Sequence, residues 1–379
     1  MGQLNFLIRC SLIGAFFIFS KATFAQVYQK NIADYILKVE NPYVFLQRIE
    51  KLGIKEVGTK SLDSTQKWLV KSVEQLGYTC YSQPFAYNLD TLRNIEFVKR
   101  GDSDSCIIIG AHYDGINGPG VNDNGSGNFA LYQMAKWIKN LKSKYTLRFV
   151  YFSGEEIGYL GSKHYVKSLN KDSIKIKFML NLDQLGGTIG EDNSGIKCER
   201  DEFSNKKVLS ASLTSTLARY FSLYTNLNPI VTPAYLSDYL SFRDSGYVIT
   251  GLYQYSAFPY YHTESDLLKH MDLVSLQSIT KGALAFLLEQ SETDVPVGIS
   301  PLMPNADVLN VYCTDGGLFC TSNKPFGLKV YDQLGRQLIL FSELNSDTFL
   351  PSNSFKPGIY YAYVFSGQNM VCKKFLVKP

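Results

Sequence analysis

The chain has 379 residues, of which 45% are hydrophobic and 19% charged, an ordinary globular composition with room for one large domain and a small one. Its formal charge of +4 includes Arg9 and Lys21 of an expected leader, so the remainder is close to neutral. This balance argues against a nucleic-acid partner and against binding to an anionic membrane.

Residues 1–25 are typical of a secretory signal peptide. Arg9 supplies the basic start, residues 11–20 the apolar segment, and Thr23-Phe24-Ala25 a cleavage site. An uncleaved anchor is the alternative, but the apolar run is short for a bilayer, and no later run is long enough. The sequence therefore predicts an exported protein without a permanent membrane span. Six cysteines remain after cleavage, which permits disulfides without deciding their pairing.

The amino-terminal part of the mature chain is expected to be helical. Apolar residues repeat at helical spacing over residues 32–52, and Asp63 and Ser64 are candidate caps of a helix that runs to Gly77. Residues 78–87 and 93–100 then have the composition of two strands.

The next stretch joins a short strand to a glycine-rich loop. Cys106–Ile109 is β-branched and too short for a helix, which indicates a buried strand whose end presents His112 and Asp114. The loop that follows carries five glycines and Asp123, and a helix is expected from about Ser126.

Two further strands end on acidic residues. The segment TLRFVYFSGEE ends on Glu155 and Glu156, and the segment KFMLNLD ends on Asp183. Open α/β sheets place their sites at the carboxyl ends of their strands, so we expect these carboxylates to converge with His112. The pattern predicts a metal site.

The rest of the chain alternates helix and strand. We expect helices at 130–138, 159–169, 208–223 and 271–288, a strand at 248–253 and an exposed polar loop at 191–207. This alternation predicts an α/β domain over residues 26–292, built on a mostly parallel mixed sheet flanked by helices. A proline-rich linker at 293–307 and a small all-β sandwich at 308–379 are expected to follow.

Five residues offer a donor set for two metal ions. Zinc binds imidazole nitrogen and carboxylate oxygen, and a catalytic zinc site leaves a position for water. The set comprises His112, Asp123, Glu156, Asp183 and His262. If Asp123 binds both ions through its two carboxylate oxygens, each ion has two further ligands among the other four residues. Taken singly, each residue has another explanation: a core or loop histidine, a turn aspartate, or an acid at a helix amino terminus.

Four segments make the sequence recognisable: GAHYDGINGPGVNDNGSG, LRFVYFSGEE, LNLDQLGG and YHTESD. In this order they resemble the motifs of the bacterial leucyl aminopeptidase family of co-catalytic zinc metallopeptidases, in the superfamily that also contains glutaminyl cyclases. The resemblance covers residues 53–289 and implies the zinc exopeptidase fold with two zinc ions per chain. It also implies that His112 and Glu156 bind one ion, Asp183 and His262 the other, and that Asp123 bridges them.

The same resemblance assigns roles around the ions. Glu155 is expected to be the general base, which takes a proton from the attacking water and passes it to the leaving amine. Asp114 is expected to hold the imidazole of His112 through its carboxylate. A cis peptide bond is expected after Asp123, at the bond to Asn124.

The substrate pocket is expected to differ from that of the family. Tyr235 and Asp238 are candidate pocket residues, but Tyr235 is out of register with the tyrosine of relatives. Tyr239 stands where the family commonly has histidine, and Gln184 where methionine is common.

The carboxyl-terminal segment carries a second resemblance. VYDQLGRQL and PGIYYAYVFSGQNMVCKKFLVKP are similar to the C-terminal sorting domain of type IX secretion. The matching positions are Tyr331, Asp332, Gly335, Arg336, Gly358, Tyr360 and the tail from Lys373. The resemblance implies recognition by the type IX secretion machinery and a protein that is secreted or attached to the outer cell surface. An Ig-like adhesion module is the alternative.

The resemblance as a whole predicts a hydrolase, an aminopeptidase that acts on peptides with free amino termini. A glutaminyl cyclase with one zinc ion, a carboxypeptidase and a non-catalytic binding module are the alternatives. Because neither a ligand position nor the base position is lost, the binding module is the weakest of them.

Overall fold

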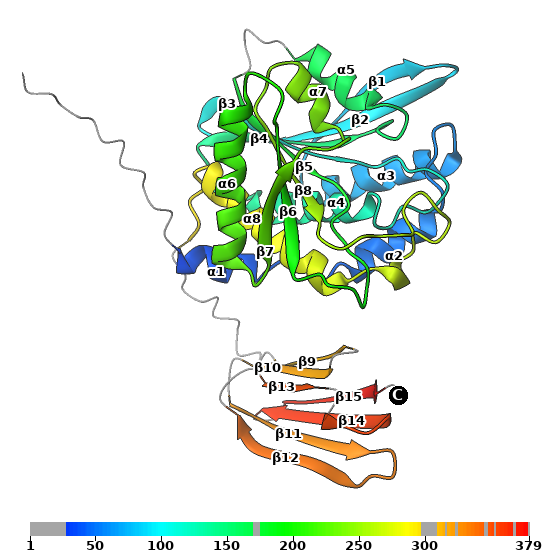
Figure 1. Cartoon of the computed structure of the whole chain (residues 1–379), viewed down its shortest axis with the longest axis vertical. Coiled ribbons are helices and arrows are strands. Elements are labelled where there is room, and N and C mark those ends of the chain that lie inside the picture. Colours follow the sequence, from blue (N-terminus) through cyan, green and yellow to red (C-terminus); the bar gives the residue numbers. More distant parts are fainter. Residues whose placement is uncertain are drawn as a thin grey trace, which may run out of the picture.

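The computed structural model describes residues 28–169, 175–296, 309–314, 317–322, 325–344, 348–351, 354–366 and 369–377. The expected signal peptide and most of the expected linker lie outside these residues. The described chain forms an α/β domain that ends near residue 296 and a separate β domain that begins at residue 309 (Figure 1).

Three helices precede the first strand, as expected. They are α1 (Lys30–Ile36), α2 (Tyr43–Leu52) and α3 (Lys60–Gln75). The helix α3 begins earlier than the expected caps at Asp63 and Ser64, because Thr59 caps it. The hydroxyl of Thr59 accepts a hydrogen bond of 3.2 Å from the backbone N–H of Leu62.

An eight-stranded sheet forms the centre of the α/β domain. Its strands are β1 (Cys80–Tyr87), β2 (Asp90–Lys99), β3 (Ser103–His112), β4 (Tyr145–Phe152), β5 (Ile176–Leu182), β6 (Gly195–Arg200), β7 (Asn228–Pro233) and β8 (Ile249–Gln254). They are arranged in the order β1-β2-β4-β3-β5-β8-β6-β7. The inner strands β4, β3, β5 and β8 are parallel, whereas β1–β2, β2–β4 and β6–β8 are antiparallel pairs. The prediction of a mostly parallel mixed sheet is confirmed.

The prediction of a loop at residues 191–207 is wrong, because this segment contains β6. Ile196 and Cys198 are fully buried, and Cys198 lies opposite Leu252 of β8 in the register. The two apolar residues alternate with Lys197 and Glu199, a period of two that the surrounding polar residues obscured. The edge strand β7 was not expected either.

Helices cover both faces of the sheet (Figure 1). One face packs against α4 (Gly125–Ile138), α6 (Lys207–Tyr224) and α8 (Leu273–Gln290), and the other against α5 (Leu160–Ser168) and α7 (Tyr239–Asp244). Neighbouring side chains of a strand point to opposite faces, so Ile107 and Ile109 of β3 belong to the first core and Ile108 to the second. A short 3₁₀ helix, η1 (Leu268–His270), precedes α8.

The carboxyl-terminal domain consists of two antiparallel sheets, as predicted. Its strands are β9 (Leu309–Thr314), β10 (Gly317–Ser322), β11 (Phe326–Asp332), β12 (Gln337–Leu344), β13 (Thr348–Pro351), β14 (Gly358–Ser366) and β15 (Asn369–Val377). The sheets have the orders β13-β10-β9 and β12-β11-β14-β15. Leu318 of the smaller sheet and Leu328, Val330 and Ala362 of the larger one share a core. Within the described residues of either domain, we find no helix with the length and apolar character that a membrane crossing requires.

Candidate metal centre

The carboxyl ends of the parallel strands bring the predicted donors together. His112 is the last residue of β3, and Asp183 follows β5 directly. Glu156 lies in the loop after β4, and His262 in the longer loop after β8. Asp123 comes from the glycine-rich loop, two residues before α4. All five donors line one cavity of about 640 Å³.

The five side chains form two groups that share one carboxylate. The Nε2 atom of His112 lies 3.3 Å from Asp123 Oδ1 and 3.3 Å from Asp183 Oδ1. The Nε2 atom of His262 lies 3.4 Å from Asp123 Oδ2 and 2.8 Å from Glu156 Oε2. In each group the donor atoms lie within 4.8 Å of one another. The two oxygens of Asp123 therefore face different groups, as a bridging ligand requires.

Among the described residues the expected pairing of Asp183 with His262 is not found, whereas His112 and Glu156 do occur together, in a third group that also contains Glu155. The two groups that share Asp123 place His112 with Asp183 and Glu156 with His262. The reason lies in the sheet order. The strand β5 is a direct neighbour of β3, so Asp183 reaches His112, whereas the loop after β8 carries His262 to Glu156.

The negative charge of the clustered carboxylates favours the binding of divalent cations. Burial raises the pKa of Glu155 to about 10 and that of Asp238 to about 7, and neighbouring carboxylates add to both shifts. Ionised carboxylates packed this closely need compensating positive charge. The Oε1 atom of Glu156 is also buried and has no hydrogen-bond partner among the described residues. Imidazole and carboxylate donors with an unused oxygen are suited to zinc.

Asp114 positions the loop after β4 and also lies beside the imidazole of His112. Its two carboxylate oxygens accept hydrogen bonds of 3.2 Å from the backbone N–H groups of Glu155 and Glu156. The Nδ1 atom of His112 lies 3.2 Å from the backbone carbonyl oxygen of Asp114, but 3.8 Å from the carboxylate. The expected carboxylate–imidazole contact is thus present as a long ion pair, with the carbonyl oxygen closer to the ring, and the acid also sets the direction of the two glutamates.

The glycine-rich loop is held by an acid from the other end of the domain. The peptide bond between Asp123 and Asn124 is cis, as predicted. The carboxylate of Asp266 accepts hydrogen bonds from the backbone N–H groups of Asn122 and Asp123, at 2.7 and 2.9 Å. The buried Lys55 donates to the backbone carbonyl of Pro119 in the same loop. Asp266 was not among the predicted site residues, although it lies four residues after His262 in the YHTESD segment.

We expect Asp266→Asn to destabilise the domain and to weaken its binding of zinc. An asparagine offers one acceptor instead of two, so one buried N–H of the loop loses its partner, at a cost of about 1–3 kcal/mol. At about 2–4 °C per kcal/mol for a domain of this size, the melting temperature should fall by several degrees. Thermal unfolding with and without zinc, and calorimetric titration with zinc, measure the two effects. The exposed Glu264→Gln serves as the control, and an Asp266→Asn variant that behaves like it would refute the assignment.

The two candidate pocket residues have different surroundings. Tyr235 lines the cavity and is 74% exposed. Asp238 is fully buried and does not line the cavity, so it does not form part of the pocket wall as expected. The cavity wall instead contains Tyr239 and, hydrogen-bonded to it, Glu199 of β6. Glu199 was not predicted because the strand that carries it was not predicted.

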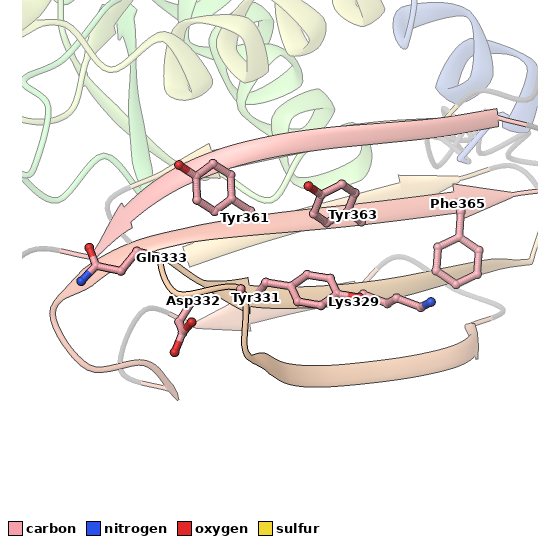
Figure 2. Close-up of a pocket in the computed structure, with 8 residues that line it drawn as sticks. Lys329, Tyr331, Asp332, Gln333, Tyr361, Tyr363 and Phe365 are labelled. Atoms are coloured by element: carbon pink, nitrogen blue, oxygen red, sulfur yellow. The ribbon is translucent and has the colours of Figure 1, made fainter.

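A second hollow lies on the carboxyl-terminal domain (Figure 2). It has a volume of about 600 Å³, and Tyr331, Tyr361, Tyr363 and Phe365 of the neighbouring strands β11 and β14 line it. Among the described residues it contains no cluster of histidine and acidic side chains. The hollow therefore lacks the donors of the metal centre.

The chain is similar in sequence to known peptidases. A model of peptidase family M28 matches residues 94–287, about half of the chain. The curated aminopeptidase YwaD of Bacillus subtilis is 28% identical over 234 residues, which are 60% of this chain and 49% of that protein. The chain spans between 20% and 49% of the length of this and other curated aminopeptidases that it matches.

Solved structures show the same fold. The LapA aminopeptidase of Legionella pneumophila superposes with a TM-score of 0.61 at 21% identity, over 70% of this chain and 77% of that one. The glutaminyl cyclase of Porphyromonas gingivalis superposes with a TM-score of 0.57 at 21% identity, over 66% of this chain and 97% of that one. At such identities the likeness concerns the fold, which therefore does not by itself separate the two activities.

Proposed function

Because this chain belongs to peptidase family M28, we propose that it is an aminopeptidase that uses two zinc ions to release single residues from the free amino termini of peptides. The observation that carries the proposal is the pair of donor groups around Asp123, with Glu155 beside them. The curated relative YwaD, which is named an aminopeptidase, supports it.

The residues of the site divide the work of hydrolysis between them. Zinc held by the two groups would supply a Lewis acid that activates water and polarises the scissile carbonyl. Glu155 lies 8% exposed on the cavity wall, next to the ligand Glu156 but outside the two groups that share Asp123. The positive charge of zinc held beside it would lower the raised pKa of Glu155. Its carboxylate would then take a proton from the attacking water and give it to the leaving amine. The hydrogen bonds from Glu155 and Glu156 to Asp114 keep the base and the ligand in fixed directions.

A peptidase assay with a parallel cyclase assay tests the proposal. The purified protein is incubated with leucine anilide and with a peptide that begins with glutamine, each with and without chelator, and its zinc content is measured. We expect release of leucine, loss of this activity with chelator, and two zinc ions per chain. Formation of pyroglutamate at one zinc ion per chain would support the cyclase instead, and a zinc-loaded chain without either activity would contradict both.

For the carboxyl-terminal domain we propose a role as the sorting signal of type IX secretion, following export by the signal peptide. The order of the matching residues near the end of the chain supports this. In the turn between β11 and β12, the carboxylate of Asp332 accepts hydrogen bonds from the backbone N–H groups of Leu334 and Arg336, at 2.9 and 3.0 Å, and from Arg336 Nε at 2.7 Å. The motif residues thus have a clear structural use in a hairpin turn, which an adhesion module would share.

Cell fractionation in a host with type IX secretion distinguishes a sorting signal from an adhesion module. The full chain is compared with a chain that lacks residues 373–379, and retention of the shortened chain inside the cell supports a sorting signal.

A chain that ends at residue 296 is expected to fold and to keep its activity. Every donor, Glu155 and all residues lining the cavity precede this position, and the α/β domain has its own core. Activity towards leucine anilide should stay within about twofold of that of the full chain, with an unchanged melting transition of the α/β domain. A shortened protein that stays folded but is inactive would show that the carboxyl-terminal domain contributes to catalysis.

A further inference from the structure

A lysine on the wall of the metal-centre cavity forms no salt bridge within the described residues, and we propose that it selects peptides whose first residue is aspartate or glutamate. The residue is Lys197, and the inference names the substrate class of the proposed aminopeptidase, on which it rests.

The strand β6 places Lys197 beside the metal centre. Ile196 and Cys198 are fully buried in the core, whereas Lys197 and Glu199, which alternate with them, both line the cavity. Their side chains share one face of the strand because residues two apart point the same way. This face looks into the same cavity as the donors of the two metal groups.

The ammonium group of Lys197 is positioned but not neutralised. Its Nζ atom lies 5.1 Å from the centroid of the Tyr253 ring, a cation–π distance. Within the described residues Lys197 has no ion pair and no side-chain hydrogen bond. An aromatic face holds an ammonium group without occupying its three N–H donors, so these remain for a ligand.

The contacts of Tyr253 connect Lys197 to the metal centre. The hydroxyl of Tyr253 donates to Gln184 Oε1 at 3.1 Å, and Gln184 Nε2 donates to Asp123 Oδ2 at 3.1 Å. Two side chains therefore separate the cation from the carboxylate shared by the two metal groups. The proposal requires that the first side chain of a peptide held at the metal centre extends along this wall. The glutamine in place of the family's usual methionine makes this polar connection possible.

The nearby acid, Glu199, is already engaged. It is 5% exposed, and its Oε2 atom accepts a hydrogen bond of 2.8 Å from the hydroxyl of Tyr239. Burial raises its pKa to about 7, although Lys197 acts in the opposite direction. Tyr239 OH in turn accepts from the backbone N–H of Tyr235 at 2.7 Å. Within the described residues, Lys197 acts on Glu199 through its charge but forms no salt bridge or hydrogen bond with it.

The ammonium group of Lys197 therefore favours a substrate whose first side chain is anionic over one whose first side chain is aliphatic. Leucine in this part of the cavity would remove water from Lys197 without replacing its hydrogen bonds, which is unfavourable. A carboxylate would supply charge-assisted hydrogen bonds in a partly dehydrated place. A lysine or arginine side chain would meet the like charge of Lys197 and be disfavoured.

The test compares kcat/KM for the anilides of glutamate, aspartate, leucine and lysine. We expect the wild-type chain to prefer an acidic anilide to leucine. Lys197→Met should lower kcat/KM for the acidic anilides about 10- to 100-fold, the effect of one charged hydrogen-bonded pair, and leave leucine within about threefold. Lys197→Arg should retain the acidic preference. Lys163→Met serves as the control. Lys163 is exposed and does not itself line the cavity, although the Tyr159 ring beneath it does, so this variant should change kcat/KM for neither the acidic anilides nor leucine anilide.

The outcomes separate this inference from the function on which it rests. Hydrolysis of leucine anilide in preference to both acidic anilides would overturn the role of Lys197 and leave the aminopeptidase intact. The same conclusion follows if the wild-type chain prefers lysine anilide, or if Lys197→Met lowers all four substrates equally. A chain that hydrolyses none of the anilides would instead contradict the proposed function.

Discussion

Glu155→Gln is expected to lower kcat by about 10²- to 10⁴-fold while the zinc content stays at that of the wild-type chain. The glutamine keeps the size of the side chain and can still form a hydrogen bond, but it does not accept a proton at neutral pH. The loss should appear in kcat more than in KM, since the proton moves in the transition state. The structure is consistent with this division of roles, because Glu156 contacts His262 at 2.8 Å and Glu155, which lies in a third group with His112 and Glu156, belongs to neither group that contains Asp123.

Glu156→Gln is the matched control, because it changes the neighbouring residue in the same way. It removes one charged oxygen from the group of Asp123, Glu156 and His262, so it should weaken the binding of one zinc ion. Metal analysis after dialysis and steady-state kinetics with leucine anilide measure both variants. If Glu155→Gln loses zinc while Glu156→Gln loses rate alone, the roles assigned to the two glutamates are reversed.

Asp123→Ala is expected to abolish the binding of both zinc ions and to lower activity by about 10³-fold or more, the equivalent of several kcal/mol of transition-state stabilisation. Asp123 is the member that the two groups share. Without it, His112 and Asp183 remain as one pair and Glu156 and His262 as the other, and two protein ligands are fewer than a zinc site normally has.

Asp183→Ala provides the comparison that tests the pairing found in the structure. It leaves Asp123, Glu156 and His262 in place, so one zinc ion should stay bound. Zinc content, together with circular dichroism to show that each variant is folded, distinguishes the two cases. A folded Asp123→Ala chain that retains one ion would show that the carboxylate is not shared. Loss of both ions in Asp183→Ala would show that the two groups do not bind independently.

The sequence was sufficient to locate the donors along the chain. The apolar run before His112 and the strands that end on Glu155, Glu156 and Asp183 are local patterns. In open α/β sheets, the carboxyl ends of parallel strands lie at one edge, so side chains there can be expected to meet. The same local reasoning predicted most of the helices and the separate all-β domain, since periodicity and turn residues depend on neighbouring positions.

Local patterns failed where tertiary contacts outweighed composition. The strand β6 contains charged residues and is flanked by polar and charged segments in the sequence. It forms because β8 and β7 supply backbone partners. Missing this strand also concealed Lys197 and Glu199, which its register directs into the cavity. In the same way, no feature near Asp266 indicates that its carboxylate binds the backbone N–H groups of Asn122 and Asp123, more than 140 residues earlier in the chain.

The candidate donors could thus be named from the sequence, whereas their grouping was decided by the tertiary structure. Chain order does not specify which strands are neighbours or which loop crosses to which side chain. The placement of β3 beside β5 joins His112 to Asp183, and the loop after β8 joins His262 to Glu156. Asp114 shows the same limit: two residues from His112 in sequence, its carboxylate binds the N–H groups of Glu155 and Glu156, because the folded sheet brings that loop within hydrogen-bonding distance.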